Sequence, residues 1–183
     1  MTFKDPYYVK NPQPVKGYKA FNFDLSCRPG GNVVMYKIGK EHVMEDPPIL
    51  CERGFHFCPR LYDVFAWYGW CFDTRVCEVE STGNRVESAD GKKFCTDRIR
   101  IVRELSPGEI VDSLDTRDRL VRKGLSDVRD SIDAFLNKGT RYVLWAHRES
   151  IRHARKKDLP YLEERANEWT KALDNLEEKE DMK

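Results

Sequence analysis

The spacing of apolar residues changes along this chain of 183 residues, and that change restricts the fold more than any other feature of the sequence. Between residues 17 and 106, apolar and polar side chains mostly alternate, which is typical of half-buried strands. In FCTDRIRIVREL, for example, Ile99 and Ile101 fall on one face of a predicted strand. Beyond residue 106 the apolar spacing becomes three to four residues, which is typical of amphipathic helices.

This pattern predicts an α+β protein with a mixed or antiparallel sheet and a C-terminal helical extension. We expect a proline-containing extended arm over residues 1–16, an α+β domain over residues 17–106 and a helical region over residues 107–183. The segments GYKAFNF, NVVMYKIG, GFHFC and RVCEVES are predicted strands, whereas TGNRVESADGKK and SPGE are predicted turn regions. A helix face is predicted from the spacing of Leu61, Val64, Phe65 and Tyr68.

The helical region is predicted to contain four helices, over residues 112–125, 126–139, 140–157 and 158–183. The last of these carries an apolar stripe at helical spacing. Its members are Leu162, Ala166, Trp169, Leu173 and Leu176. We expect this stripe to face protein, either the chain's own sheet domain or a second copy in a homodimer. An exposed stripe would instead make Trp169 a partner-binding residue.

The stretch CERGFHFC brings two of the six cysteines close to a histidine. Cys51, His56 and Cys58 offer three metal ligands, but no C-x-x-C pair occurs, and Cys51 would point away from the other two along a strand. We therefore predict no metal site and interpret the cysteines as reduced, buried thiols. His56 has two interpretations: a half-buried residue bonded to the backbone, or a ring in a binding pocket.

Charge is unevenly distributed, although the whole chain carries a formal net charge of +1. Residues 97–157 contain 15 basic and 10 acidic side chains, whereas residues 158–183 contain 4 basic and 9 acidic side chains. A basic helical face is predicted within the first of these segments. Its members are Arg141, Arg148, Arg152 and Arg155. Nucleic acid is a conceivable ligand for this face, but the small net charge favours a protein partner.

Several functional classes have no support in the sequence. It contains no Walker loop, no Gly-x-Gly-x-x-Gly, no His-Glu-x-x-His and no Gly-x-Ser-x-Gly motif. No stretch is apolar enough to predict a membrane span, and the start, MTFKDPYYVK, does not resemble a secretion signal. These features predict a cytoplasmic protein.

The combination GYKAF, DLSCR, YKIGK, LCERGFHFC, DVFAWY, CEVES and TDRIRIVREL resembles a domain of unknown function that is common in bacteriophages and bacteria. The resemblance implies an accessory protein of phage or mobile-element type. Such a protein would act in the host cytoplasm by binding and modulating a host or defence macromolecule.

A second resemblance is to the core of the ADP-ribosyltransferases. The order of GFHFC, the helix at 60–68 and the strand at 75–80 is similar to theirs. The resemblance implies an NAD-dependent transferase, active or degenerate, with catalytic residues Tyr18, His56 and Asp97 converging on one point. The implied cofactor-binding residues are Lys19, Phe55 and Tyr68. His56 stands where that family has a Tyr that stacks on nicotinamide, and Asp97 where it has a Glu. These departures leave open whether the chain is an enzyme.

Overall fold

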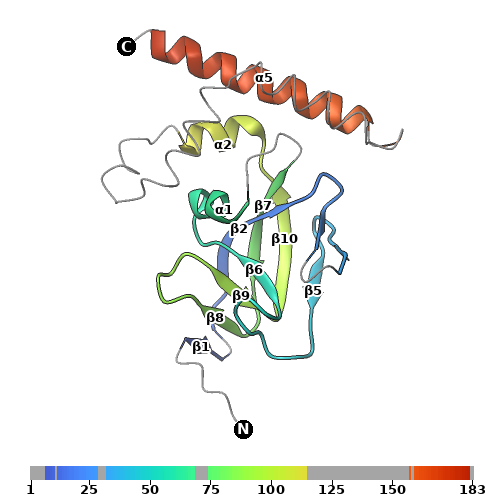
Figure 1. Cartoon of the computed structure of the whole chain (residues 1–183), viewed down its shortest axis with the longest axis vertical. Coiled ribbons are helices and arrows are strands. Elements are labelled where there is room, and N and C mark those ends of the chain that lie inside the picture. The colour runs from blue at the N-terminus through green and yellow to red at the C-terminus, as the bar shows by residue number, and fades with distance from the viewer. Residues whose placement is uncertain are drawn as a thin grey trace. The chain divides into compact units, whose positions relative to one another are not determined.

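The computed structural model describes residues 7–10, 12–28, 32–68, 74–114, 157 and 159–181. The chain divides into two compact units. One consists of residues 1–21, 25–64 and 75–104, and contains all the strands of the described part of the chain (Figure 1). The other consists of residues 22–24, 65–74 and 105–183, and contains the helices α2 and α5. The α+β class is therefore confirmed.

Two four-stranded antiparallel sheets form the framework of the first unit. One has the order β2-β7-β10-β5, with bounds Val15–Phe21, Arg75–Ser81, Arg98–Glu104 and Glu41–Val43. The other has the order β1-β8-β9-β6, with bounds Tyr8–Val9, Arg85–Glu87, Phe94–Thr96 and Phe55–Phe57. A short hairpin pairs β3, Ser26–Cys27, with β4, Val34–Met35.

The two sheets are joined where β2 meets the end of β6. Tyr18 and Cys58 form an antiparallel bridge in which each backbone N–H donates to the carbonyl of the other, at 2.7 and 2.8 Å. Gly17 makes this approach possible. A Cβ at that position would lie 2.5 Å from the Cys58 carbonyl oxygen and 2.6 Å from the Phe57 ring.

The core of this unit follows from the alternation of side chains along the strands. Inward-facing residues of both sheets form one buried cluster. Its members are Phe21, Tyr36, Phe57, Cys77, Val79, Phe94, Ile99 and Ile101. Ile99 and Ile101 are buried while Arg98 and Arg100 are exposed, as the alternation in the sequence predicts.

The strand predictions are correct in type but not in every boundary. FCTDRIRIVREL forms two strands rather than one, because the chain bends at Asp97 and passes from β9 in one sheet to β10 in the other. NVVMYKIG forms only the two-residue strand β4. The segment TGNRVESADGKK, predicted as a turn region, contains the strand β8, which pairs with both β1 and β9.

The first helix, α1, spans Leu61–Trp67 and confirms the helix predicted from the apolar spacing. Leu61, Val64 and Phe65 are buried, whereas Tyr68 lies beyond the end of the helix and is exposed. The observed helix therefore ends at Trp67, one residue before the last member of the predicted helix face.

In the second unit, α2 spans Pro107–Leu114 and α5 spans Leu159–Asp181. Ser106 caps α2: its Oγ accepts from the Glu109 N–H at 3.2 Å, while Glu109 Oε2 accepts from the Ser106 N–H at 2.9 Å. SPGE is thus a helix start rather than only the turn predicted from the sequence. The other helices predicted between residues 115 and 156 lie outside the described residues.

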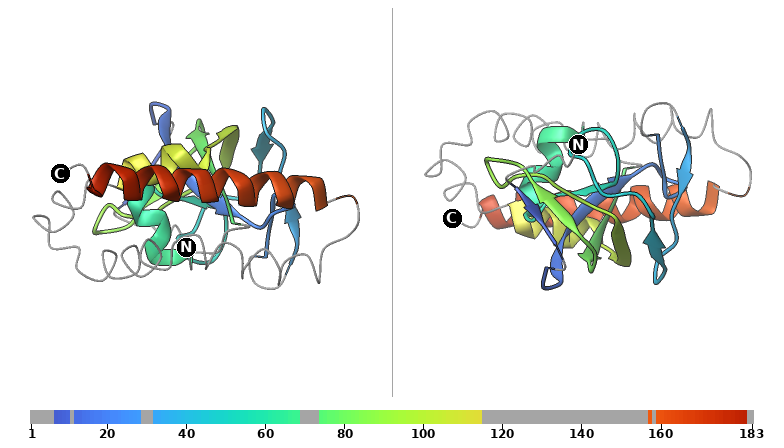
Figure 2. Two further views of the ribbon diagram at one scale, coloured as in Figure 1. Left: turned by 90° about the horizontal axis from the view of Figure 1, so that it is seen from above. Right: turned by 90° about the horizontal axis from the view of Figure 1, so that it is seen from below.

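Helix α5 is continuous from end to end (Figure 2) and packs against α2. Leu162, Ala166, Trp169 and Leu173 are all buried, so the predicted stripe faces protein within a single chain. The Leu176 side chain lies outside the described part of the structure. Arg165 is also buried, and its Nη1 donates to the Leu105 carbonyl at 3.2 Å. None of the described helices is both long enough and apolar enough to cross a membrane.

The burial of Trp169, at 1% exposure, predicts a large effect of its removal on stability. Trp169→Ala should lower the free energy of unfolding by about 3–5 kcal/mol, because it leaves a cavity where a large ring was packed. It should not change the mass of the protein in solution. Glu164→Ala, an exposed position on the same helix, is the matched control in thermal unfolding and light scattering. A change from dimer to monomer in Trp169→Ala would contradict packing within one chain.

Candidate functional site

A histidine and two cysteines lie together on the outer side of β6. Phe55 and Phe57 turn inward toward the core cluster, so His56 and Cys58 turn outward. The β6–β9 ladder pairs His56 with Cys95, which places the Cys95 side chain on the same outer side. His56 and Cys58, which the sequence analysis singled out, therefore lie with Cys95 on one face of one strand pair.

A tight turn over residues 49–53 lies against this face. Ile49 and Arg53 pair across the turn through two backbone hydrogen bonds, at 2.7 and 2.9 Å. Gly54 then redirects the chain into β6 with a φ of 127°, a conformation that side-chain-bearing residues rarely adopt. A Cβ at Gly54 would lie 2.4 Å from Cys95 Sγ, so glycine is required here both for conformation and for space.

The turn is fixed to β6 by the ring of His56. The backbone N–H of Cys51 donates to His56 Nε2 at 2.9 Å. This confirms the interpretation of His56 as a partly buried residue bonded to the backbone. It also corrects the expectation that Cys51 lies on the same strand as His56, because Cys51 belongs to a turn that folds back and brings its backbone N–H to the His56 ring.

The environment of His56 keeps its ring neutral. The pKa of His56 is lowered from 6.5 to about 4, mainly by burial and then by the positive charges of Lys19 and Lys93, against a hydrogen bond to the Gly54 backbone that raises it. A neutral ring is what the contact with Cys51 requires, because Nε2 must carry a free lone pair to accept the N–H.

Cys51 is the exposed member of the cluster. Its Sγ lies 3.0 Å from Lys93 Nζ, and its φ of 68° is in the left-handed region. Cys58 and Cys95 are buried, and burial raises the pKa of each thiol to about 12. Both are therefore protonated and unreactive, which supports the prediction that Cys58 is a packed residue.

Lys19 approaches the same strand from the opposite side. It is only 5% exposed, and its Nζ donates to the His56 carbonyl at 2.9 Å. The ammonium also lies 5.5 Å from the ring centre of Phe21 and 5.7 Å from that of Tyr36. The only sequence signal for this buried cation is its position among inward-facing residues of β2.

The residues implied by the ADP-ribosyltransferase resemblance are not brought to one point. Tyr18 pairs with Cys58 at one end of β6, whereas Asp97 follows Thr96, which pairs with Phe55 at the other end. A strand rise of ~3.3 Å per residue separates these two ends by roughly 10 Å. The Asp97 carboxylate accepts from Asn84 Nδ2 at 2.7 Å, and the ring of His56 is engaged by Cys51.

The implied cofactor-binding residues are also dispersed. Lys19 is inside the sheet unit, and Phe55 packs against the core with its ring near Tyr36 and His42. Tyr68 lies after α1 and is partly exposed. Of the predicted partner-binding residues, Trp169 is buried, and the four arginines lie outside the described residues. No group of three metal-ligating side chains occurs within the described ranges.

The fold and this cluster define a small α+β protein with two joined antiparallel sheets and a cysteine-bearing turn on β6. The chain belongs to the family described as Domain of unknown function (DUF7666), whose pattern matches residues 15–113. The match covers every strand of the two four-stranded sheets except β1, together with the 49–53 turn and nearly all of α2. No curated protein matches the chain, and no solved structure does.

The lowered pKa of His56 predicts a loss of stability in acid. The neutral ring contributes stability that is fully present above pH 6.5 and is lost as the pH falls toward about 4, because the unfolded chain binds the proton more readily. The size of the contribution is on the order of 3 kcal/mol. His56→Gln keeps a hydrogen-bond acceptor but does not titrate. Urea unfolding between neutral pH and about pH 4 should show a smaller acid-induced loss in His56→Gln than in the native protein. Equal losses would contradict a buried neutral ring.

Proposed function

We propose that this protein is a small accessory protein, of the kind that bacteriophages and mobile elements encode, which acts by binding a host or defence protein. The resemblance of its sequence to a domain common in bacteriophages supports the phage-type assignment. The observation that carries the binding function is an exposed apolar surface over residues 33–43, here called the β4–β5 segment.

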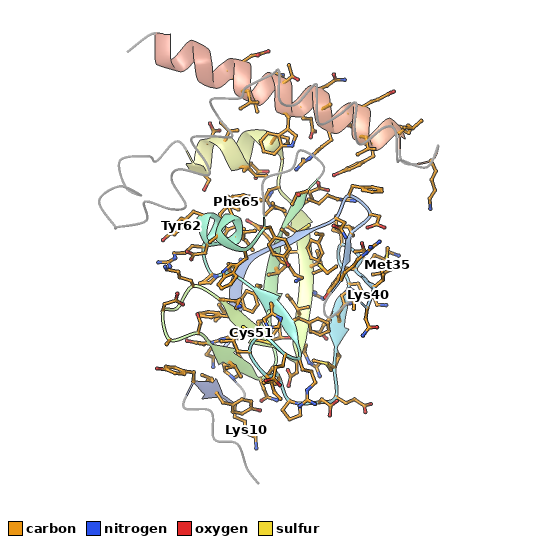
Figure 3. All side chains as sticks on the ribbon, viewed as in Figure 1. Lys10, Met35, Lys40, Cys51, Tyr62 and Phe65 are labelled. Atoms are coloured by element: carbon orange, nitrogen blue, oxygen red, sulfur yellow. The ribbon has the colours of Figure 1, made fainter. Side chains whose placement is uncertain are left out.

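Four large apolar side chains of the β4–β5 segment are open to solvent. Val33, Met35, Ile38 and Val43 are 58%, 55%, 37% and 55% exposed. Val34 packs against the core, so Val33 and Met35, which precede and follow it, point away from the core. Figure 3 labels Met35 and Lys40 on the β5 side of the sheet unit. Four exposed apolar side chains within one short segment of the chain support a binding surface there.

The same segment contains an open sheet edge. Among the described residues, β5 pairs only with β10. On either side of β5, the Lys40 carbonyl accepts from the Ile101 N–H at 3.2 Å and the Met44 N–H donates to the Asp97 carbonyl at 2.8 Å. By the alternation of an antiparallel ladder, the N–H and C=O groups of Glu41 and Val43 therefore point to the unpaired side. An extended segment of a partner can add to such an edge through backbone hydrogen bonds.

The charge of the segment indicates the partner's chemistry. Lys37 and Lys40 are exposed, and neither forms an ion pair with the described acidic side chains. Glu41 is already engaged by Arg98 at 3.3 Å and by Thr82 at 2.9 Å. The surface therefore fits an extended protein segment that carries both apolar and acidic side chains.

No comparable observation favours ADP-ribosyl transfer from NAD. Tyr18 and Asp97 lie at opposite ends of β6, and Lys19 and Phe55 face the interior. The basic helical face of the sequence, which includes Arg148 and Arg152, is a second surface that a partner could use.

The test compares capture of a host protein by the full-length chain and by surface variants. Met35→Asp combined with Val43→Asp should reduce capture at least tenfold without changing the melting temperature, because both side chains are exposed. Lys37→Glu combined with Lys40→Glu should also weaken capture relative to the native protein. This loss should be largest at low salt, where the charges of the surface are least screened. Lys16→Asp, an exposed position on β2, is the matched control.

Undiminished capture by the Met35→Asp, Val43→Asp variant would exclude the β4–β5 segment. Loss of capture in Arg148→Glu, Arg152→Glu alone would assign binding to the helical region instead. If the native protein captures no partner in the host, the proposed function fails.

A further inference from the structure

The pair formed by Cys51 and Lys93 has a geometry that suggests chemistry beyond binding. The two residues are 42 positions apart in sequence, yet Sγ and Nζ are 3.0 Å apart. Figure 3 labels Cys51 beside the β6–β9 strand pair. The pair is independent of the β4–β5 segment, so the inference does not depend on the proposed function.

Both members of the pair are held by their backbones. The N–H of Cys51 donates to His56 Nε2, which fixes the tip of the 49–53 turn. The N–H of Lys93 donates to Ser88 Oγ at 3.0 Å, and its carbonyl accepts from the Ser88 N–H at 2.8 Å. The approach of sulfur to nitrogen therefore follows from anchored backbone positions and not only from two long side chains meeting in solvent.

Among the described cysteines, Cys51 is the one that is exposed to small oxidants in the solvent. Cys58, Cys77 and Cys95 are buried, and the thiol of Cys27 donates to the Ala20 carbonyl at 3.6 Å. Cys51 is exposed, and a thiolate that is accessible and lies beside a cation is the form that peroxides oxidise. An ammonium group 3.0 Å away also stabilises the negative charge that develops on the leaving oxygen.

We propose that Cys51 and Lys93 form a peroxide-responsive pair, in which Lys93 captures the oxidised form of Cys51 as a covalent sulfur–nitrogen link. In the first step the Cys51 thiolate attacks one oxygen of hydrogen peroxide. The O–O bond breaks and hydroxide leaves, which takes a proton from the Lys93 ammonium to give water and an unprotonated amine. Sulfur is oxidised to a sulfenic acid, and the peroxide is reduced.

In the second step the unprotonated amine of Lys93 attacks the oxidised sulfur. The S–N bond forms as the S–O bond breaks, and the departing hydroxide combines with the proton released from nitrogen to give a second water. The net change in the protein is the loss of two hydrogens. The link joins the 49–53 turn to the start of β9, and it prevents further oxidation of the same sulfur.

The test treats the full-length protein with hydrogen peroxide and digests it with a protease that cleaves after acidic residues. Mass spectrometry should find the peptides of Cys51 and Lys93 joined, two hydrogens lighter than their sum, and separated again by a thiol reductant. Lys93→Arg keeps the positive charge but removes the nucleophilic amine. In that variant the joined species should disappear, and Cys51 should accumulate as a sulfenic acid that dimedone traps.

Cys95→Ser is the matched control, because a Cys51–Cys95 disulfide would show the same loss of two hydrogens. The joined species should persist in Cys95→Ser and be absent from Cys51→Ser. A joined species that persists in Lys93→Arg and vanishes in Cys95→Ser would overturn the proposal, as would oxidation of any other cysteine before Cys51.

Discussion

The junction between β2 and β6 is the constraint on which the rest of the first unit depends. Two hydrogen bonds between Tyr18 and Cys58 join a strand of one sheet to a strand of the other. They form only because Gly17 has no side chain where the Cys58 carbonyl and the Phe57 ring approach. With the strands joined, Phe21 and Phe57 enter one core, so both sheets bury their inner faces together.

The cysteine-bearing turn follows from the same arrangement. Because β6 gives its alternate residues Phe55 and Phe57 to the core, His56 must lie on the outer side, where the 49–53 turn covers it. Burial and two nearby cations then keep the His56 ring neutral, and the neutral ring accepts the N–H of Cys51. The position of the exposed Cys51 thiol thus depends on the packing of β6 on the core, on the burial of His56 and on the hydrogen bond between His56 and the Cys51 backbone.

The sequence predicts the elements of this fold better than it predicts their assembly. Alternation identifies the inward residues Ile99 and Ile101, and helical spacing identifies the buried Trp169. Periodicity carries no information about the bend at Asp97, because alternation continues across it while the chain changes sheets. Nor could local spacing place Cys51 beside Lys93, since that contact depends on a turn and a ladder formed by residues far apart in sequence. The ADP-ribosyltransferase resemblance implied that Tyr18 and Asp97 converge, but the order of elements could not predict their places at opposite ends of β6, because similar element order does not fix register.

Unfolding of Gly17→Ala tests the central role of the β2–β6 junction most directly. A Cβ at this position would lie 2.5 Å from a backbone oxygen, which cannot move without breaking the bridge. The substitution should cost on the order of 1–3 kcal/mol or more in the free energy of unfolding. Gly108→Ala is the control, since a Cβ there meets nothing closer than 4.0 Å and alanine favours the helix α2. Stability in Gly17→Ala equal to that of the native protein would contradict the dependence of both sheets on this contact.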